Sequence, residues 1–363
     1  MPDAVDLTNA LHPRNDSERL LFRNLSESLV RLDCREELRP GLAEVWSHDS
    51  AGTWALTLRD RARFGSARRV SAADVVSNLA SARTKGLGID SASMLNGRQL
   101  RVFFSAPNQV SALRVLADPA LAIGHEIGTQ SPAGRTIDIT AQGSQPLIQI
   151  RFLPLGDPRD ALDRGADLIV SRHPELIEYA AGRPEFATFA LPWSRTYVLV
   201  QPASGESLGP ATTDGERRSL ARDAVEADAR VAEPPFWWEQ SLACPTAETP
   251  TTPPAGDRIA YVQGDEVARA LAERLVALAG PGTRLRITAL DQSGFAAALR
   301  AGSERAYVLA LPKQVLDPCP EVSDLPGGAR IQPLIESRAH AIVRRGAPPL
   351  MVEWDGTVRV AEP

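Results

Sequence analysis

Three short apolar runs in the C-terminal third of the chain are separated by two amphipathic segments. The runs Arg258–Val262, Arg284–Leu290 and Ala306–Leu311 have the length and apolar content of buried strands. Between them, Asp265–Ala279 and Ser293–Arg300 carry apolar residues at three- and four-residue spacing, which predicts helices. Strands that alternate with helices build a parallel sheet covered by helices. The pattern predicts a small α/β lobe and constrains the fold more than any other feature.

The sequence before this lobe predicts a boundary within the chain. Asp214–Val231 has the composition of a helix rich in arginine and alanine, which ends before Pro234-Pro235 because proline cannot continue the backbone hydrogen bonds. The Pro/Thr-rich stretch Cys244–Gly256 then predicts a surface loop or hinge. A chain of 363 residues is long enough for two lobes with separate cores.

The N-terminal half predicts further helices and strands in alternation. Helical spacing of apolar residues predicts an opening helix over Ser17–Leu32, capped by Asp16 or Ser17. Period-2 alternation predicts a half-buried strand over Thr53–Arg59, and Ser71 is the expected N-cap of a second helix. The other expected elements are a turn at Asn96-Gly97, strands over Leu100–Phe104, Ile148–Leu153, Asp167–Val170 and Arg195–Val200, and helices over Val110–Leu116 and Arg159–Arg164. The fold class is therefore mixed α/β.

Charge and hydropathy argue against two classes of partner. The net charge of −5 arises from 40 basic and 45 acidic residues without a basic block, so we expect no nucleic-acid partner. No apolar run approaches the roughly 20 residues that span a bilayer. The cysteines Cys34, Cys244 and Cys319 lack the paired spacing of a zinc site, and their disulfide state is left open.

No motif with a defined catalytic chemistry is recognisable. The sequence has no G-x-S-x-G elbow, phosphate-binding loop or dinucleotide fingerprint. Its histidines are scattered singly, at positions His12, His48, His125, His173 and His340. We therefore expect no metal, no cofactor and no enzymatic activity. A hydrolase stays an alternative, since catalytic triads assemble from distant positions.

Several segments follow the order and spacing of a known family. Asn24–Asp33, Arg39–Trp46 and Thr53–Arg59 match its first-lobe segments, and the second of these matches its P-x-L-A-x-x-W motif. Arg218–Arg230 and Ala268–Leu278 match two of its later helices. The chain thus resembles the family 5 extracellular solute-binding proteins, which include oligopeptide, dipeptide and nickel binders. The resemblance implies a two-lobed periplasmic-binding-protein-like fold of type II, similar to cluster C.

The resemblance also implies how the lobes divide. The segment after Asp317 is shorter than in the family, so we expect a reduced second lobe. Gly65–Arg69 lacks the family's D-G-x-P turn, and Ser26 replaces an aromatic residue; both changes are expected to reshape the cleft. The expected division is lobe I from 1–35, 141–235 and 326–363 with a subdomain over 36–140, and lobe II from 236–325.

Five residues are candidates for ligand contact. By resemblance, Asp317 occupies the position of an aspartate that holds the α-ammonium of a peptide, although Asp317-Pro318 is also an ordinary turn. Trp193 precedes a strand that leads toward the lobe boundary, so it either stacks on a ligand or packs in the core. Asn15, Asp16 and Ser17 open the first helix, where they either line the family's cleft or cap the helix.

The resemblance implies a role in transport. We expect a monomeric binding component that captures a small peptide or similar solute for a cognate ABC transporter permease. The alternatives are a ligand-sensing domain and a degenerate domain without ligand. The expected location is periplasmic or extracellular, with a lipoprotein anchor as one form of attachment. No export signal is visible in Met1–Asp6, so we expect the native product to carry a leader upstream.

Overall fold

In the computed structural model of the protein, the chain divides into two compact units. Unit 1 comprises residues 1–170, 184–187 and 341–363, and unit 2 comprises 171–183 and 188–340. The residues that the structure describes are 13, 15–48, 52–60, 62, 68–80, 87–104, 109–124, 136–139, 148–151, 157–203, 214–223, 228–233, 236, 238, 256–279, 284–314 and 323–360.

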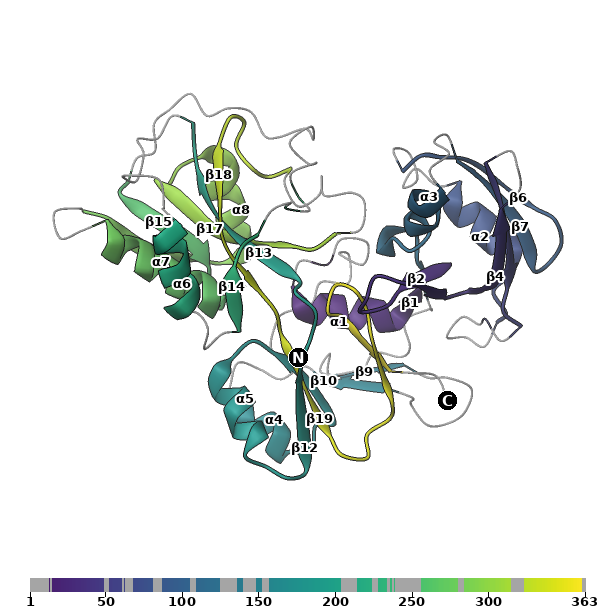
Figure 1. Cartoon of the computed structure of the whole chain (residues 1–363), viewed down its shortest axis with the longest axis horizontal. Helices are drawn as coiled ribbons and strands as arrows, with labels where there is room; N and C mark the ends of the chain where they lie inside the picture. The colour runs from purple at the N-terminus through teal and green to yellow at the C-terminus, as the bar shows by residue number, and fades with distance from the viewer. Residues whose placement is uncertain are drawn as a thin grey trace. The chain divides into compact units, whose positions relative to one another are not determined.

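Unit 2 is built on a six-stranded sheet (Figure 1). Its strand order is β14 (Ala229–Val231), β18 (Arg330–Ser337), β13 (Arg195–Gln201), β17 (Ala306–Pro312), β15 (Arg258–Val262) and β16 (Arg286–Leu290). Strand β15 pairs in parallel with β16 and β17, whereas β13 is antiparallel to β17 and β18. The parallel β-α-β-α-β unit predicted from sequence is confirmed, and its helices are α7 (Glu266–Leu278) and α8 (Gln292–Ala301).

Alternate residues of β13 build two cores on the two faces of this sheet. Tyr197 and Leu199 belong to a core that includes residues of α7 and α6 (Asp214–Asp223). Val198 and Val200 belong to a second core, which includes residues of α8. Because side chains point to opposite faces with a period of two, a strand buried on both faces reads as a continuous apolar run.

In unit 1, a four-stranded antiparallel sheet carries the segment that follows the opening helix. Its order is β4 (Ala43–His48), β5 (Thr53–Leu58), β7 (Gln99–Phe104) and β6 (Ile89–Met94). Trp54, Leu56 and Leu58 are buried, which confirms the predicted alternation. Helix α2 (Ala72–Leu79) contacts β6 and β7, and α3 (Gln109–Val115) follows.

Helix α2 begins with a capping box, as its sequence predicts. Ser71 Oγ accepts a hydrogen bond from the backbone N–H of Asp74, and the Asp74 carboxylate accepts one from the Ser71 N–H at 2.8 Å. We expect Ser71→Ala to lower the free energy of unfolding by about 1 kcal/mol, because the backbone N–H of Asp74 loses the hydroxyl that accepts its hydrogen bond. Urea denaturation measures this change, and an unaltered midpoint would contradict it.

The predicted opening helix is too long. Helix α1 (Asp16–Leu25) stops at Ser26, whose hydroxyl donates to the carbonyl of Phe22 at 2.7 Å and whose backbone is extended. The chain continues as β1 (Ser26–Glu27) and β2 (Val30–Leu32). The sequence predicted a longer helix because the strand β2 also buries apolar residues, Val30 and Leu32, and these continue the apolar spacing of the helix.

The helix predicted over Asp214–Val231 is also too long. It ends as α6 at Asp223, and the chain then forms β14, which pairs with β18. Asp228 precedes this strand with a φ of 53°, a left-handed conformation that no helix continues.

Four two-stranded sheets and one three-stranded sheet make up the rest of the described strands. The sheet contains β11 (Leu168–Ser171), β19 (His340–Arg344) and β12 (Phe186–Ala190), with α4 (Arg159–Asp163) and α5 (Pro174–Ala181) nearby in sequence. The remaining pairs are β1 with β8 (Ile123–Gly124), β2 with β3 (Leu38–Pro40), β9 (Thr136–Ile139) with β10 (Ile148–Arg151), and β20 (Leu350–Val352) with β21 (Val358–Val360); a 3₁₀ turn covers Pro119–Leu121.

The boundaries of the units differ from those expected for the lobes. The sequence prediction assigned 141–235 and 326–363 to lobe I and 236–325 to lobe II. In the structure, β13, β14 and β18 are hydrogen-bonded into the sheet that contains β15–β17. A strand buried on both faces cannot be separated from the neighbours that complete its ladder, so these segments lie in unit 2. Unit 1 is discontinuous and includes both N- and C-terminal segments.

Candidate functional site

The three candidates at the start of α1 lie in unit 1. Asn15 is the N-cap, because its Oδ1 accepts a hydrogen bond from the backbone N–H of Glu18 at 2.8 Å. Asp16 lies in the first turn, where a carboxylate is favourable beside the positive end of the helix, and Ser17 is buried. The capping function of this group is confirmed, but the cap is Asn15 and not Asp16 or Ser17. A ligand contact here stays a prediction.

A buried ion cluster lies at the other end of α1, in its last turn. Arg23 of α1 forms ion pairs with Asp355 at 2.8 Å and with Glu353 at 3.3 Å, and all three side chains are less than 10% exposed. Both carboxylates belong to the turn between β20 and β21. The cluster therefore joins the first helix to the last hairpin of the residues that the structure describes.

Further buried ion pairs lie close to the C-terminal end of α1. Arg359 of β21 lies 3.7 Å from Glu353 and donates to the carbonyl of Ser26 at 3.0 Å. On β1, Glu27 is buried and accepts from Arg59 at 2.6 Å. These contacts join the β20–β21 hairpin and the end of β5 to β1, the short strand that follows α1.

Burial and ion pairing shift the pKa values of the two carboxylates in opposite directions. Burial alone raises the pKa of Asp355, but the charges of Arg23 and Arg19 lower it below its usual value. Burial raises the pKa of Glu353 above its usual range despite Arg23 and Arg359. In the folded protein, nearby arginines therefore outweigh the cost of burying the charge of Asp355, but they do not outweigh it for Glu353.

Trp193 lies in unit 2, between β12 and β13, and is half-buried. The guanidinium carbons of Arg230 and Arg338 both lie 4.6 Å from the centre of its ring. Such contacts contribute about 0.5–1 kcal/mol each at exposed sites. The ring is thus engaged by arginines of its own unit, and a ligand that stacks on it must share or displace them.

Each of these arginines is held by a carboxylate. Arg230 forms a 2.6 Å hydrogen bond with Glu336, and Arg338 makes a two-pronged contact with Asp228. The Nε2 atom of His340 also lies 2.6 Å from Asp228. Burial raises the pKa of Asp228, but bonding to Arg338 and His340 outweighs this effect and lowers it.

Asp317, the proposed ammonium anchor, lies outside the described residues, as do His12, His125, Cys244 and Cys319. Its function is therefore still a prediction. Cys34 is exposed and has a free thiol.

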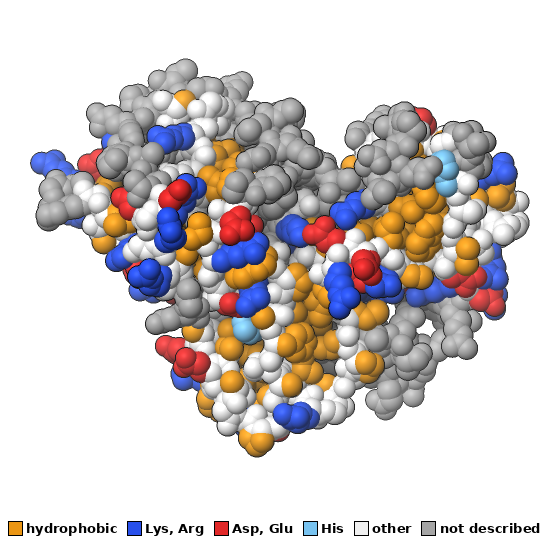
Figure 2. All heavy atoms as spheres, viewed as in Figure 1, with side chains coloured by type: hydrophobic (Ala, Val, Ile, Leu, Met, Phe, Trp, Pro, Cys, Tyr) orange, Lys and Arg blue, Asp and Glu red, His pale blue; other side chains and the backbone are white. Residues whose placement is uncertain are grey.

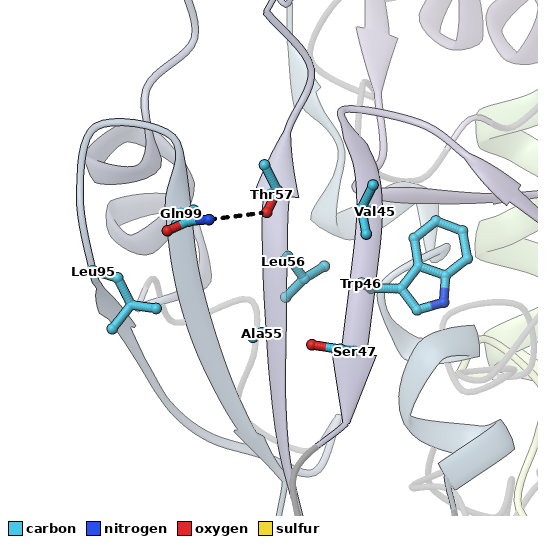
Figure 3. A pocket seen from close by; sticks show the side chains of 8 residues that line it. All are labelled: Val45, Trp46, Ser47, Ala55, Leu56, Thr57, Leu95 and Gln99. Carbon is cyan, nitrogen blue, oxygen red and sulfur yellow. Dashed lines mark hydrogen bonds between the residues drawn. The ribbon is translucent and has the colours of Figure 1, made fainter.

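A shallow pocket of about 140 Å³ lies on the four-stranded sheet of unit 1 (Figure 3). It is lined by side chains of β4, β5 and β7 and by Leu95 of the β6–β7 turn. Thr57 and Gln99 are joined by a long hydrogen bond of 3.4 Å, and Val45 and Leu95 are about half exposed. The sequence analysis did not single out this pocket.

Within the described ranges, no group of three or more potential metal ligands and no helix that could span a membrane is found. Figure 2 shows acidic and basic side chains interspersed over the face in view.

Sequence reasoning missed the ion cluster and the arginines around Trp193. The sequence signal for the ion cluster was weak. It consisted of Arg19 and Arg23, which lie four residues apart in a helix whose other regularly spaced residues are apolar. For the second there was no local signal, because Trp193, Asp228 and Arg338 are far apart in sequence.

Comparison with solved structures places the whole chain in one fold. NikA from Brucella suis in complex with Fe(III)-EDTA matches with a TM-score of 0.69 at 15% identity, over 98% of this chain and 97% of that chain. NikZ from Campylobacter jejuni in complex with Ni(L-His) matches with a TM-score of 0.70 at 12% identity, over 98% and 96%. DppA from Helicobacter pylori in complex with peptide STSA gives 0.66 at 12% identity, over 99% and 97%. Neither a family profile nor a curated protein sequence matches the chain.

The chain therefore has the fold of the periplasmic binding proteins. The matched structures are of the family 5 type, so the resemblance stated from the sequence is confirmed at the level of the fold.

Proposed function

We propose that this chain is the solute-binding component of an ABC importer and has no catalytic activity of its own. The observation that carries the proposal is the match, over nearly the full length of both chains, to binding proteins whose structures contain a captured solute. The chain divides into two compact units, between which it passes four times, and small-molecule sites occur preferentially in proteins at domain interfaces.

The proposed ligand is a small peptide or a similar solute. The matched proteins hold Ni(L-His), a short peptide and, in MoaA from A. tumefaciens R10, mannopinic acid. These solutes share a small size and charged groups. Asp317 is the proposed partner of a ligand ammonium, and Trp193 and Asn15–Ser17 are proposed to lie at the ligand.

The proposed partner is a cognate permease, and the proposed location is the periplasm or the cell exterior. Fractionation of cells that produce the native gene product tests this location, and a purely cytosolic protein would favour the sensor alternative.

A thermal-shift screen tests the binding function. The panel contains di- to pentapeptides, nickel–histidine, ferric EDTA and mannopinic acid. A ligand present at one hundred times its Kd stabilises the folded state by about 2.7 kcal/mol, which raises the melting temperature by several degrees. Intact recovery of each ligand excludes hydrolysis. If no member shifts the melting temperature, the degenerate alternative replaces the proposal.

Asp317→Asn then tests the anchor. Because the substitution keeps the shape and removes the charge, it should weaken a ligand with a free ammonium group by about 1.5–3 kcal/mol. An N-acetylated form of the same ligand is the control and should be unaffected. Equal affinities before and after the change would exclude Asp317 as the anchor.

A further inference from the structure

An exposed turn joins β6 to β7, and Asn96 and Gly97 lie in it. This is the Asn-Gly pair that the sequence predicted as a turn, and the dipeptide occurs nowhere else in the chain. The backbone nitrogen that follows an asparagine can attack the carbonyl carbon of its side chain, and glycine hinders this attack least because it has no Cβ. Apart from its chain neighbours, no atom of the described residues lies within 4 Å of the place that a Cβ would take at Gly97. The reacting groups are therefore open to water.

The side-chain carbonyl of Asn96 is held by two backbone donors. Its Oδ1 accepts hydrogen bonds from the N–H groups of Arg98 and Gln99, both at 2.9 Å. Donors at this position draw electron density from Cγ, and they stabilise the negative charge that forms on Oδ1 when a nucleophile adds to Cγ. In this respect the turn resembles an oxyanion hole.

The backbone nitrogen of Gly97 is the available nucleophile. No described residue is found to accept a hydrogen bond from its N–H, whereas the N–H groups of Asn96, Arg98 and Gln99 are all bonded within the turn. Loss of the Gly97 proton therefore breaks no hydrogen bond of the turn. One bond opposes the reaction, because Asn96 Nδ2 donates to Gln99 Oε1 at 2.7 Å and must release it before ammonia leaves. Gln99 is exposed, so water can take its place.

We propose that Asn96 is a modification site, at which the turn promotes spontaneous deamidation with water as the only co-reactant. The Gly97 nitrogen loses its proton to water and forms a bond to Asn96 Cγ. The bond from Cγ to Nδ2 then breaks, ammonia leaves, and a cyclic imide remains. Water adds to one of the two imide carbonyls and opens the ring. The product is aspartate or, where the main chain now runs through the side chain, isoaspartate. This inference does not depend on the proposed function.

Isoaspartate lengthens the main chain of the turn by one methylene group. The carbonyl of Gly97 accepts a hydrogen bond from the N–H of Ala72 at 3.0 Å, at the start of α2, and the carbonyl of Gln99 accepts one from Leu95 at 2.8 Å. A longer main chain cannot keep both bonds in this geometry. Leu95 and Gln99 also line the pocket of Figure 3, so the modification alters that pocket.

Peptide mass spectrometry of protein aged in warm, mildly alkaline buffer made with heavy-oxygen water tests the proposal. We expect heavy oxygen to enter at position 96, with isoaspartate and aspartate resolved by chromatography. Asn24 and Asn78, which lie within α1 and α2 and precede leucine, are internal controls and should stay unchanged. In the folded chain, Asn96 should react at least as fast as in the chain unfolded in urea. A folded chain that reacts several times more slowly would mean that the turn protects Asn96, and would overturn the proposal.

Two variants test the nucleophile and the consequence. Gly97→Ala should slow the reaction severalfold, because a Cβ shields the backbone nitrogen and restricts its approach. An unchanged rate would exclude attack by this nitrogen. Asn96→Asp has the charge of the product but the normal main chain. Isoaspartate protein, separated from it by ion exchange, should therefore unfold at a lower urea concentration than Asn96→Asp, and equal midpoints would overturn the inferred effect on the turn.

Discussion

Replacement of Arg23 by methionine should lower the free energy of unfolding by about 3–5 kcal/mol, the usual cost of removing one partner from a buried ion pair. Methionine retains the apolar stem, but Asp355 and Glu353 are left as buried carboxylates without the cation at 2.8 and 3.3 Å. Urea denaturation followed by circular dichroism measures the loss. Arg39→Met is the control, since Arg39 pairs with Asp33 on the surface, and its midpoint should hardly change.

The pH dependence of this variant distinguishes loss of charge from loss of packing. In the wild type, the lowered pKa of Asp355 means that its contribution is present above its unfolded pKa of about 4 and is lost as the pH falls through the folded pKa. The pKa of Glu353 is raised in the folded state, so this residue affects stability in the opposite direction. Its contribution to stability is lost as the pH rises through the folded pKa. Without Arg23, burial raises both values. The difference in free energy of unfolding between the wild type and Arg23→Met should therefore become smaller from pH 7 toward pH 5. A difference that does not change with pH would indicate that Arg23 stabilises the protein through packing alone.

A methyl group at Gly41 should destabilise unit 1 by about 2–3 kcal/mol, as overpacking of a close contact does. A Cβ there would lie 2.3 Å from the carbonyl oxygen of Ser28 and 2.9 Å from that of Leu29. Both atoms are backbone, and they accept hydrogen bonds from Leu42 and Ala43, so neither can withdraw without breaking a bond. The measurement is the urea midpoint of Gly41→Ala.

Gly97→Ala provides the matched control for this substitution. No atom lies within 4 Å of a Cβ at Gly97, which sits in the β6–β7 turn. The free energy of unfolding of Gly97→Ala should stay within about 0.5 kcal/mol of that of the wild type, as for most substitutions on a protein surface. Equal midpoints for the two variants would show that the backbone at Ser28 and Leu29 moves aside freely.

The sequence predicted the parts of the fold in which local pattern and tertiary burial agree. Residues 258–262 form a strand with the predicted bounds, and the helix expected from Asp265 begins directly after that residue, which caps it. The sequence prediction was wrong where the apolar spacing of a helix continued into a buried strand, as at Val30 and Ala229. There the partner strands β3 and β18 override the local preference.

The candidate site was less predictable because its geometry depends on distant partners. Asn15 could be placed near a helix start from its residue type alone. The contacts of Trp193 with Arg230 and Arg338 depend instead on the pairing of β14 and β18, which no local spacing encodes. Charged residues of this kind are indistinguishable in sequence from those of a solvated surface.

The nested order of the two units has a consequence for synthesis. Arg23 leaves the ribosome long before Glu353 and Asp355, with the whole of unit 2 translated in between. All strands of the six-stranded sheet of unit 2 have been synthesised once β18 has emerged. Arg23 of α1, in contrast, has no carboxylate partner until Glu353 and Asp355 have been synthesised. Vectorial folding therefore finishes the inserted unit first, and the final residues close the unit that was begun first.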